Sequence, residues 1–238
     1  DECFYNCSRL TSINIPSSID QIGIKCFCDC ISLSSISIPA SVSKICEMCF
    51  CGCTRLTNLV IDPMNKHYVI EDDVIFSKEK SKIVEYIPCN RRVAYFIPSF
   101  VHEVGNRCFQ MCTSLSSITI PTSVSFIGKY CFDGCNSLTE LQVGGWQLRG
   151  WSSISSITIP TSVSESRNYC FRGCTSLSSV HIPTSVKEIG DECFSECSSL
   201  SLIIIPTSVC MIGKSCFSRC SSLLNISIPS SVSEINNL

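Results

Sequence analysis

Cysteine is the residue whose number and spacing in this chain could support chemistry. The chain has 21 cysteines among 238 residues, and most of them lie in eight copies of a Cys-Phe-x-x-Cys motif, called the Cys-Phe box below. This spacing differs from the Cys-x-x-Cys pairs that hold structural zinc. Because a free cysteine packs as a small hydrophobic residue, we interpret the boxes as rows of buried thiols that are reduced and hold no metal.

No second set of residues points to catalysis. The three histidines, His67, His102 and His181, are far apart in the sequence, and no serine or carboxylate recurs beside them at a fixed spacing. The sequence also lacks a glycine-rich phosphate loop and a paired-carboxylate motif. We therefore expect no enzymatic activity, no cofactor and no metal site.

The Cys-Phe boxes recur at a fixed period, which indicates how the chain must position them. Within each run the first cysteines of successive boxes are 23 residues apart, and Ile-Pro pairs keep the same step. A period of this length is typical of a solenoid, in which stacked units bury one continuous core. The boxes begin at Cys3, Cys26, Cys49, Cys108, Cys131, Cys170, Cys193 and Cys216.

One complete repeat, residues 177–199, shows the elements of a unit. Large apolar residues alternate with small polar ones over residues 177–182, which predicts a strand that Pro183 ends because proline has no N–H for the sheet. Residues 186–189 suit a second short extended segment. Residues 191–197 suit about one helical turn that directs the Cys-Phe box into the core.

This pattern resembles the BspA-like leucine-rich repeat, and the resemblance covers nearly the whole chain. Every box departs from the family in the same way, because cysteine stands where the family has alanine before phenylalanine. We expect an α/β fold: a right-handed leucine-rich-repeat solenoid with a parallel sheet on one face and short helical turns and extended segments on the other. One turn carries the family pattern at Leu115, Ile118, Ile120, Pro121, Val124, Ile127, Gly128, Phe132, Cys135 and Leu138.

We expect a single domain over residues 1–238, with irregular inserts near residues 62–97 and 144–154. The first insert separates two boxes by 59 residues, and it resembles a variant unit of the same family. The chain begins and ends within a repeat, so we expect it to be an excerpt of a longer protein. Within the first insert the sequence predicts short strands at residues 68–70, 74–76 and 83–87.

Cys28 and Cys51 are two cysteines beyond the box pattern. They occupy the same position in consecutive repeats, and stacked turns lie about 5 Å apart, within the range that a disulfide can bridge. A Cys28–Cys51 disulfide is the most specific bridge that the sequence suggests. Two free thiols, or a metal held by the six thiols of these two turns, remain alternatives.

The outward positions of the predicted strands form rows across the sheet. Most of these positions hold serine, threonine or asparagine, as at Ser179 and Asn225, but Leu202 and Ile204 form an apolar step beside His181. Exposed apolar clusters on a polar face often mark contacts. Trp146 and Trp151 lie in the second insert and are either hot-spot residues or plugs for the core. We therefore predict a partner-binding site at His181, Leu202, Ile204, Ser179, Asn225, Trp146 and Trp151.

Composition excludes several classes of partner. A net charge of −2 gives no basic face for nucleic acid, and no stretch of 18 apolar residues could span a membrane. The function we favour is recognition or adhesion through the sheet face, with a protein as partner. The resemblance implies a cell-surface or secreted protein of an anaerobic bacterium or mucosal protist. The alternatives are a solenoid that binds glycan or a repetitive surface, and a spacer that presents another domain.

Overall fold

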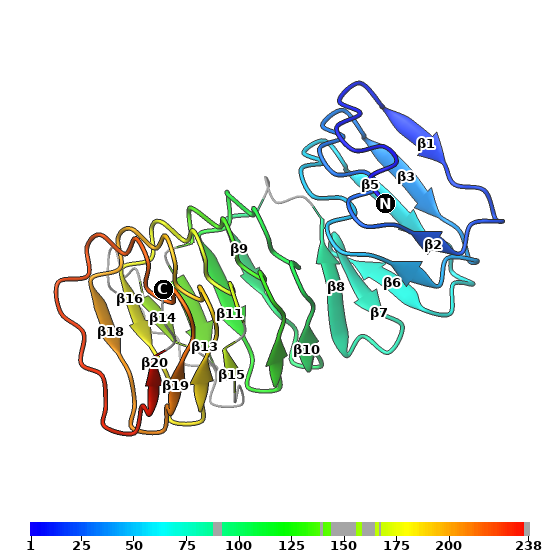
Figure 1. Ribbon diagram of the computed structural model, residues 1–238. Coiled ribbons are helices and arrows are strands. Elements are labelled where there is room, and N and C mark those ends of the chain that lie inside the picture. Colours follow the sequence, from blue (N-terminus) through cyan, green and yellow to red (C-terminus); the bar gives the residue numbers. More distant parts are fainter. Residues whose placement is uncertain (88–91, 139, 144–155, 159–164, 167, 236–238) are drawn as a thin grey trace.

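The structure is a computed structural model that describes residues 1–87, 92–138, 140–143, 156–158, 165–166 and 168–235. The chain coils into an elongated stack of turns, and its strands lie in two rows along the stack (Figure 1). Every strand pair outside the first insert is parallel. The expected solenoid with a parallel sheet on one face is therefore confirmed.

The row of longer strands forms the sheet face, which is divided into two parallel sheets. Paired residues are 23 positions apart in most pairs, as in Ser12 with Ser35 and His181 with Ile204. The three-stranded sheet contains β1 (Ser12–Asn14), β3 (Ser35–Ile38) and β5 (Asn58–Ile61). The six-stranded sheet contains β9 (Ala94–Phe96), β11 (Ser117–Ile120), β13 (Glu140–Val143), β14 (Ser156–Thr158), β16 (Ser179–His181) and β18 (Leu202–Ile204).

Apart from β8, which belongs to the first insert, the second row consists of two-residue strands that follow the proline of a repeat. One sheet pairs β2 (Gln21–Ile22) with β4 (Lys44–Ile45). Another places β8 (Lys82–Tyr86) beside β10 (Glu103–Val104) and β12 (Phe126–Ile127). The last contains β15 (Glu165–Ser166), β17 (Glu188–Ile189), β19 (Met211–Ile212) and β20 (Glu234–Ile235).

The first insert forms antiparallel strands at the predicted places. β6 (Tyr68–Glu71) pairs with β7 (Val74–Ser77), and β7 pairs with β8. β8 then continues into the parallel row through β10. The insert lies between β5 and β9, where the sheet face is interrupted (Figure 1).

The expectation of helical turns, and with it the α/β class, is wrong for the part of the chain that the structure describes, because the elements found there are all strands. In each Cys-Phe box the residue before either cysteine has a positive φ, as at Lys25 (53°) and Asp29 (60°). A right-handed helix cannot pass through such residues. The box instead forms tight turns, and alternate N–H groups bond to the next turn, as from Phe27 N to Cys49 O at 2.9 Å.

In six of the Cys-Phe boxes the second cysteine donates a hydrogen bond to the preceding turn. The Sγ of Cys53 donates to the carbonyl oxygen of Phe27, in the preceding box, at 3.0 Å. The same bond, 3.0–3.2 Å long, joins Cys30 to Phe4, Cys135 to Phe109, Cys174 to Phe132, Cys197 to Phe171 and Cys220 to Phe194. A thiol at this position therefore packs as a small apolar group and also serves a buried carbonyl.

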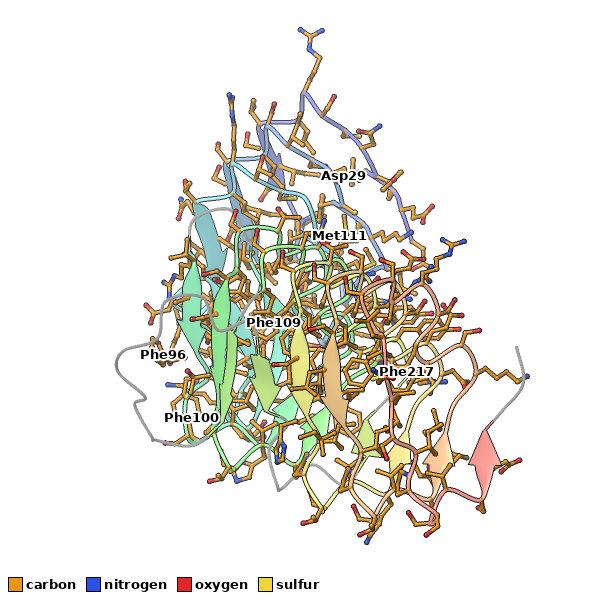
Figure 2. The ribbon with its side chains drawn as sticks, turned by 90° about the vertical axis from the view of Figure 1, so that its left-hand side faces the viewer. Asp29, Phe96, Phe100, Phe109, Met111 and Phe217 are labelled. Carbon is orange, nitrogen blue, oxygen red and sulfur yellow. The ribbon has the colours of Figure 1, made fainter. Side chains whose placement is uncertain are left out.

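The box phenylalanines form two stacks. Their shared position in the repeat predicts one continuous spine, which would run through Phe27, Phe50, Phe109, Phe132, Phe171, Phe194 and Phe217. This prediction is wrong at one point, because Phe50 and Phe109 belong to separate core clusters. Within each stack neighbouring rings are 5.4–5.8 Å apart and nearly parallel. Phe109 and Phe217 are the ends of the second stack, and Phe217 is only partly buried (Figure 2).

The break between the stacks coincides with the first insert, whose side chains replace missing main-chain groups. Glu85 is buried, and its Oε1 accepts the Phe50 N–H at 2.8 Å, where the corresponding Phe27 N–H bonds to a carbonyl. The carbonyl of Cys108 in turn accepts from Tyr86 N at 3.2 Å. The insert therefore joins two stacked bodies without leaving these main-chain groups unsatisfied.

At the other side of the insert, the Asn65 side chain also forms hydrogen bonds with main-chain groups. Its Nδ2 donates to the carbonyls of Pro39 (3.1 Å) and Val42 (2.9 Å), and its Oδ1 accepts from the N–H groups of His67 and Tyr68. The Asn65 side chain thus ties the insert to the repeat before it.

Candidate functional site

The sheet face brings four of the predicted partner-binding residues together. His181 on β16 lies beside Ile204 on β18, and Leu202 lies beside Ser179 on the same pair of strands. The side chains of Leu202 and Ile204 are each 55% exposed, and His181 is also exposed, whereas Val180 and Ile203 point into the core. Successive side chains of a strand point to opposite faces of the sheet, so Leu202 and Ile204 form an apolar step on the surface while Ile203 is buried.

Within this group Ser179 is only partly exposed. Of the other predicted residues, Asn225 is exposed but lies outside any strand. Trp146 and Trp151 lie outside the described residues. The geometry thus groups Leu202, Ile204, His181 and Ser179 at the β18 end of the six-stranded sheet.

Phe96, at the opposite end of the same sheet, is a surface residue that the sequence reasoning missed. It is 69% exposed on β9 and lies beside Thr119 in the outward row that ends at Ile204 (Figure 2). The pair Ile97-Pro98 was the signal, because the residue before Ile-Pro occupies this outward position in every repeat. Phe96 also borders a pocket of about 220 Å³ lined by Glu71, Asp72, Phe76, Arg92, Ala94, Tyr95 and Pro98.

The three-stranded sheet carries a shallow hollow of a different character. Its volume is about 420 Å³, and hydroxyl and amide groups dominate its rim. The lining residues are Ser12, Ile13, Asn14, Ser35, Ile36, Ser37, Asn58 and Val60. Such groups can donate and accept hydrogen bonds but carry no charge.

Most thiols of the Cys-Phe boxes are buried, and burial raises the pKa of several of them. It raises the pKa of Cys131 and Cys170 well above the ordinary value, and that of Cys220, near the end of the stack, to about 11. Thiols of this kind stay protonated and are poor nucleophiles and metal ligands. Cys28 differs, because a hydrogen bond with the Cys51 side chain lowers its pKa.

Two further observations concern the described residues alone. They contain no group of three or more histidine, cysteine, aspartate or glutamate side chains arranged to hold a metal ion. They also include no helix with the length and apolar character that a membrane crossing needs.

Known proteins similar to this chain share its repeat. The family model of the BspA type leucine-rich repeat region, in six copies, matches residues 1–90, 88–149 and 148–238. None of the curated proteins is significantly similar to the chain in sequence. A leucine-rich cell-surface protein from Faecalibacterium prausnitzii A2-165 is 26% identical and superposes with a TM-score of 0.72. That match covers 94% of this chain but 61% of the other, so the chain spans less than two thirds of that protein.

Two other solved structures support the fold alone. A leucine-rich repeat protein from Eubacterium ventriosum is 20% identical, with a TM-score of 0.63 over 98% of this chain and 76% of the other. The pneumococcal vaccine antigen PcpA is 21% identical, with a TM-score of 0.63 over 90% of this chain and 55% of its own.

Proposed function

Because the chain belongs to the family of BspA-type leucine-rich repeat proteins, we propose that it is a recognition module that binds a protein partner through its sheet face. The observation that carries the proposal is the exposed apolar step of Leu202 and Ile204 beside His181. The sheet face is wide and rigid, so a partner can contact several turns without disturbing the core. The sheet face contributes binding and no chemistry of its own.

The same outward row explains why binding would be specific. Short hydroxyl side chains gain little when they exchange water for a partner, whereas apolar and aromatic groups gain free energy when they are buried. Leu202 and Ile204 at one end of the six-stranded sheet and Phe96 at the other are the apolar departures from the polar row. The Faecalibacterium relative is described as a cell-surface protein, which supports the proposal of a cell-surface or secreted location.

Replacing Leu202 and Ile204 together by serine is expected to weaken binding while the fold is retained. Both side chains are exposed, so the core is unchanged, but the apolar area available to a partner is lost. If they are hot spots, the loss exceeds about 1 kcal/mol, or roughly five-fold in Kd. The measurement is surface plasmon resonance of this chain against a panel of immobilised extracellular-matrix and cell-surface proteins.

The control is Ser35→Ala with Ser37→Ala, two outward positions on β3 that should leave protein binding unchanged. Equal binding by both double variants would remove the β18 end of the sheet as the site. Residues 68–92 of the first insert would then be the next candidate. If the chain bound no protein of the panel and no glycan, the result would favour the alternative of a spacer that presents another domain.

The hollow on the three-stranded sheet favours glycan binding as a second candidate function. Asn14 and Asn58 stand on either side of β3, and amide and hydroxyl groups pair well with sugar hydroxyls. For a glycan ligand, Asn14→Ala with Asn58→Ala should abolish retention on a glycan array, whereas the Leu202/Ile204 double variant should not. Loss of glycan binding in the Leu202/Ile204 variant instead would contradict the hollow as the site.

A further inference from the structure

Cys28 and Cys51 are additional cysteines within two consecutive Cys-Phe boxes, and their side chains share a hydrogen bond. Their turns are stacked with an offset of 23 residues, as shown by the hydrogen bond from Asp29 N to Cys51 O at 2.8 Å. A Cβ built on Gly52 would lie 3.2 Å from Asp29 Cα, so residues 52 and 29 lie directly over one another. The adjacent residues 51 and 28 hold equivalent positions on the same two turns, and stacked strands lie about 5 Å apart, within the range that a disulfide can bridge.

The pair opens onto a pocket. Cys28 and Cys51 share the lining of a cavity of about 310 Å³. Cys28 itself is 4% exposed, and Cys51 is more accessible. The other lining residues are Tyr5, Lys25, Asp29, Met48, Gly52, Thr54, Met111 and Thr113, of which Asp29 and Met111 are seen on the same side of the molecule in Figure 2.

The neighbouring thiol pairs have the same spacing but not the same surroundings. Cys26 with Cys49, and Cys30 with Cys53, lie on the same two turns at the same offset. Burial raises the pKa of all four of these thiols. At Cys28 the hydrogen bond with the Cys51 side chain lowers the pKa, and the nearby Lys25 ammonium acts in the same direction.

We propose that Cys28 and Cys51 are a redox-active dithiol site, which a low-molecular-weight disulfide converts into an intramolecular disulfide between two consecutive turns. The site is independent of the recognition role of the sheet face. The sequence predicts a bridge between Cys28 and Cys51 from their spacing alone. The proposal adds a reason why this pair reacts while the equally spaced pairs Cys26–Cys49 and Cys30–Cys53 do not.

The reaction is a thiol–disulfide exchange in two steps. The two sulfur atoms share a hydrogen bond, so either can carry the thiolate, and the more accessible Cys51 meets the reagent first. Its Sγ attacks one sulfur of the small disulfide, the S–S bond breaks and one thiolate leaves. Cys28 then attacks Sγ of Cys51 and expels the second thiolate. The two protons of the protein thiols go to the leaving groups, so one disulfide is reduced to two thiols as the protein pair is oxidised.

The test uses the folded, reduced protein, with glutathione disulfide as the probe. After timed incubation the remaining thiols are blocked with iodoacetamide, and the bridges are located by peptide mass mapping. We expect a Cys28–Cys51 bridge, with the loss of two hydrogen atoms from the intact mass, to form at least about ten-fold faster than any bridge at the neighbouring pairs. Alkylation of both Cys28 and Cys51 after the incubation would overturn the proposal, as would equally fast bridging of Cys26–Cys49 or Cys30–Cys53.

Single variants separate the two steps. Cys28→Ser removes the second thiol, so the mixed disulfide between Cys51 and glutathione should accumulate. Cys46→Ser is the matched control, because Cys46 lies on the same turn as Cys51 but outside the pocket, and the Cys28–Cys51 bridge should form in it as in the parent. Bridge formation that is lost in Cys46→Ser, or a Cys28→Ser variant in which Cys51 stays a free thiol, would contradict the assignment.

Discussion

Replacing Phe132 by alanine is expected to lower the free energy of unfolding by about 3–5 kcal/mol. The ring is fully buried and lies between Phe109 and Phe171, at centroid distances of 5.4 and 5.5 Å. Truncation would therefore open a cavity in the middle of the second stack, which the neighbouring turns cannot close because hydrogen bonds hold them at a fixed spacing. Urea denaturation followed by circular dichroism measures the change.

Phe96→Ala is the matched control for this truncation. Phe96 is 69% exposed, so the same change of residue should alter the free energy of unfolding by less than about 0.5 kcal/mol. A similarly small effect at Phe132 would show that the stacked rings are not the core of this solenoid.

Replacing Asn65 by alanine is expected to cost about 2–4 kcal/mol of stability, although asparagine is a polar residue in an irregular insert. The side chain is 1% exposed, and it donates to two carbonyls and accepts from two N–H groups. Its removal leaves buried main-chain groups without partners, and each such group costs about 1–3 kcal/mol. Thermal unfolding and urea titration should both register the loss.

Two further variants show which half of the Asn65 amide matters. Asn65→Asp keeps an oxygen for the N–H groups of His67 and Tyr68 but places a second oxygen against the carbonyls of Pro39 and Val42. We expect it to be destabilised at least as much as the alanine variant. Asn58→Ala, on the exposed side of β5, should have almost no effect, and a full-sized loss there would argue against the buried hydrogen bonds as the cause.

The repeat phase made the core residues and the surface row predictable. A residue that recurs every 23 positions packs against its equivalents in the neighbouring turns, so Phe132 was predictable as a buried residue. Inward and outward side chains alternate along a strand, so Leu202 was predictable as a residue that faces outward. The strands of the first insert were predictable for the same local reason, since alternation and turn residues act within a few positions.

The sequence by itself thus determined the solenoid, the inward and outward positions, and the pairing of equivalent residues on consecutive turns. The tertiary structure alone decided what depends on contacts between turns. N–H groups that bond to the next turn, together with the positive φ of residues such as Lys25, replaced the expected helical turn. The phenylalanine spine was divided at the first insert, where the Glu85 carboxylate takes the place of a main-chain carbonyl. The hydrogen bond with the Cys51 side chain separated Cys28 from equally spaced thiols, because the pKa of a thiol depends on its surroundings in space and not on its position in a repeat.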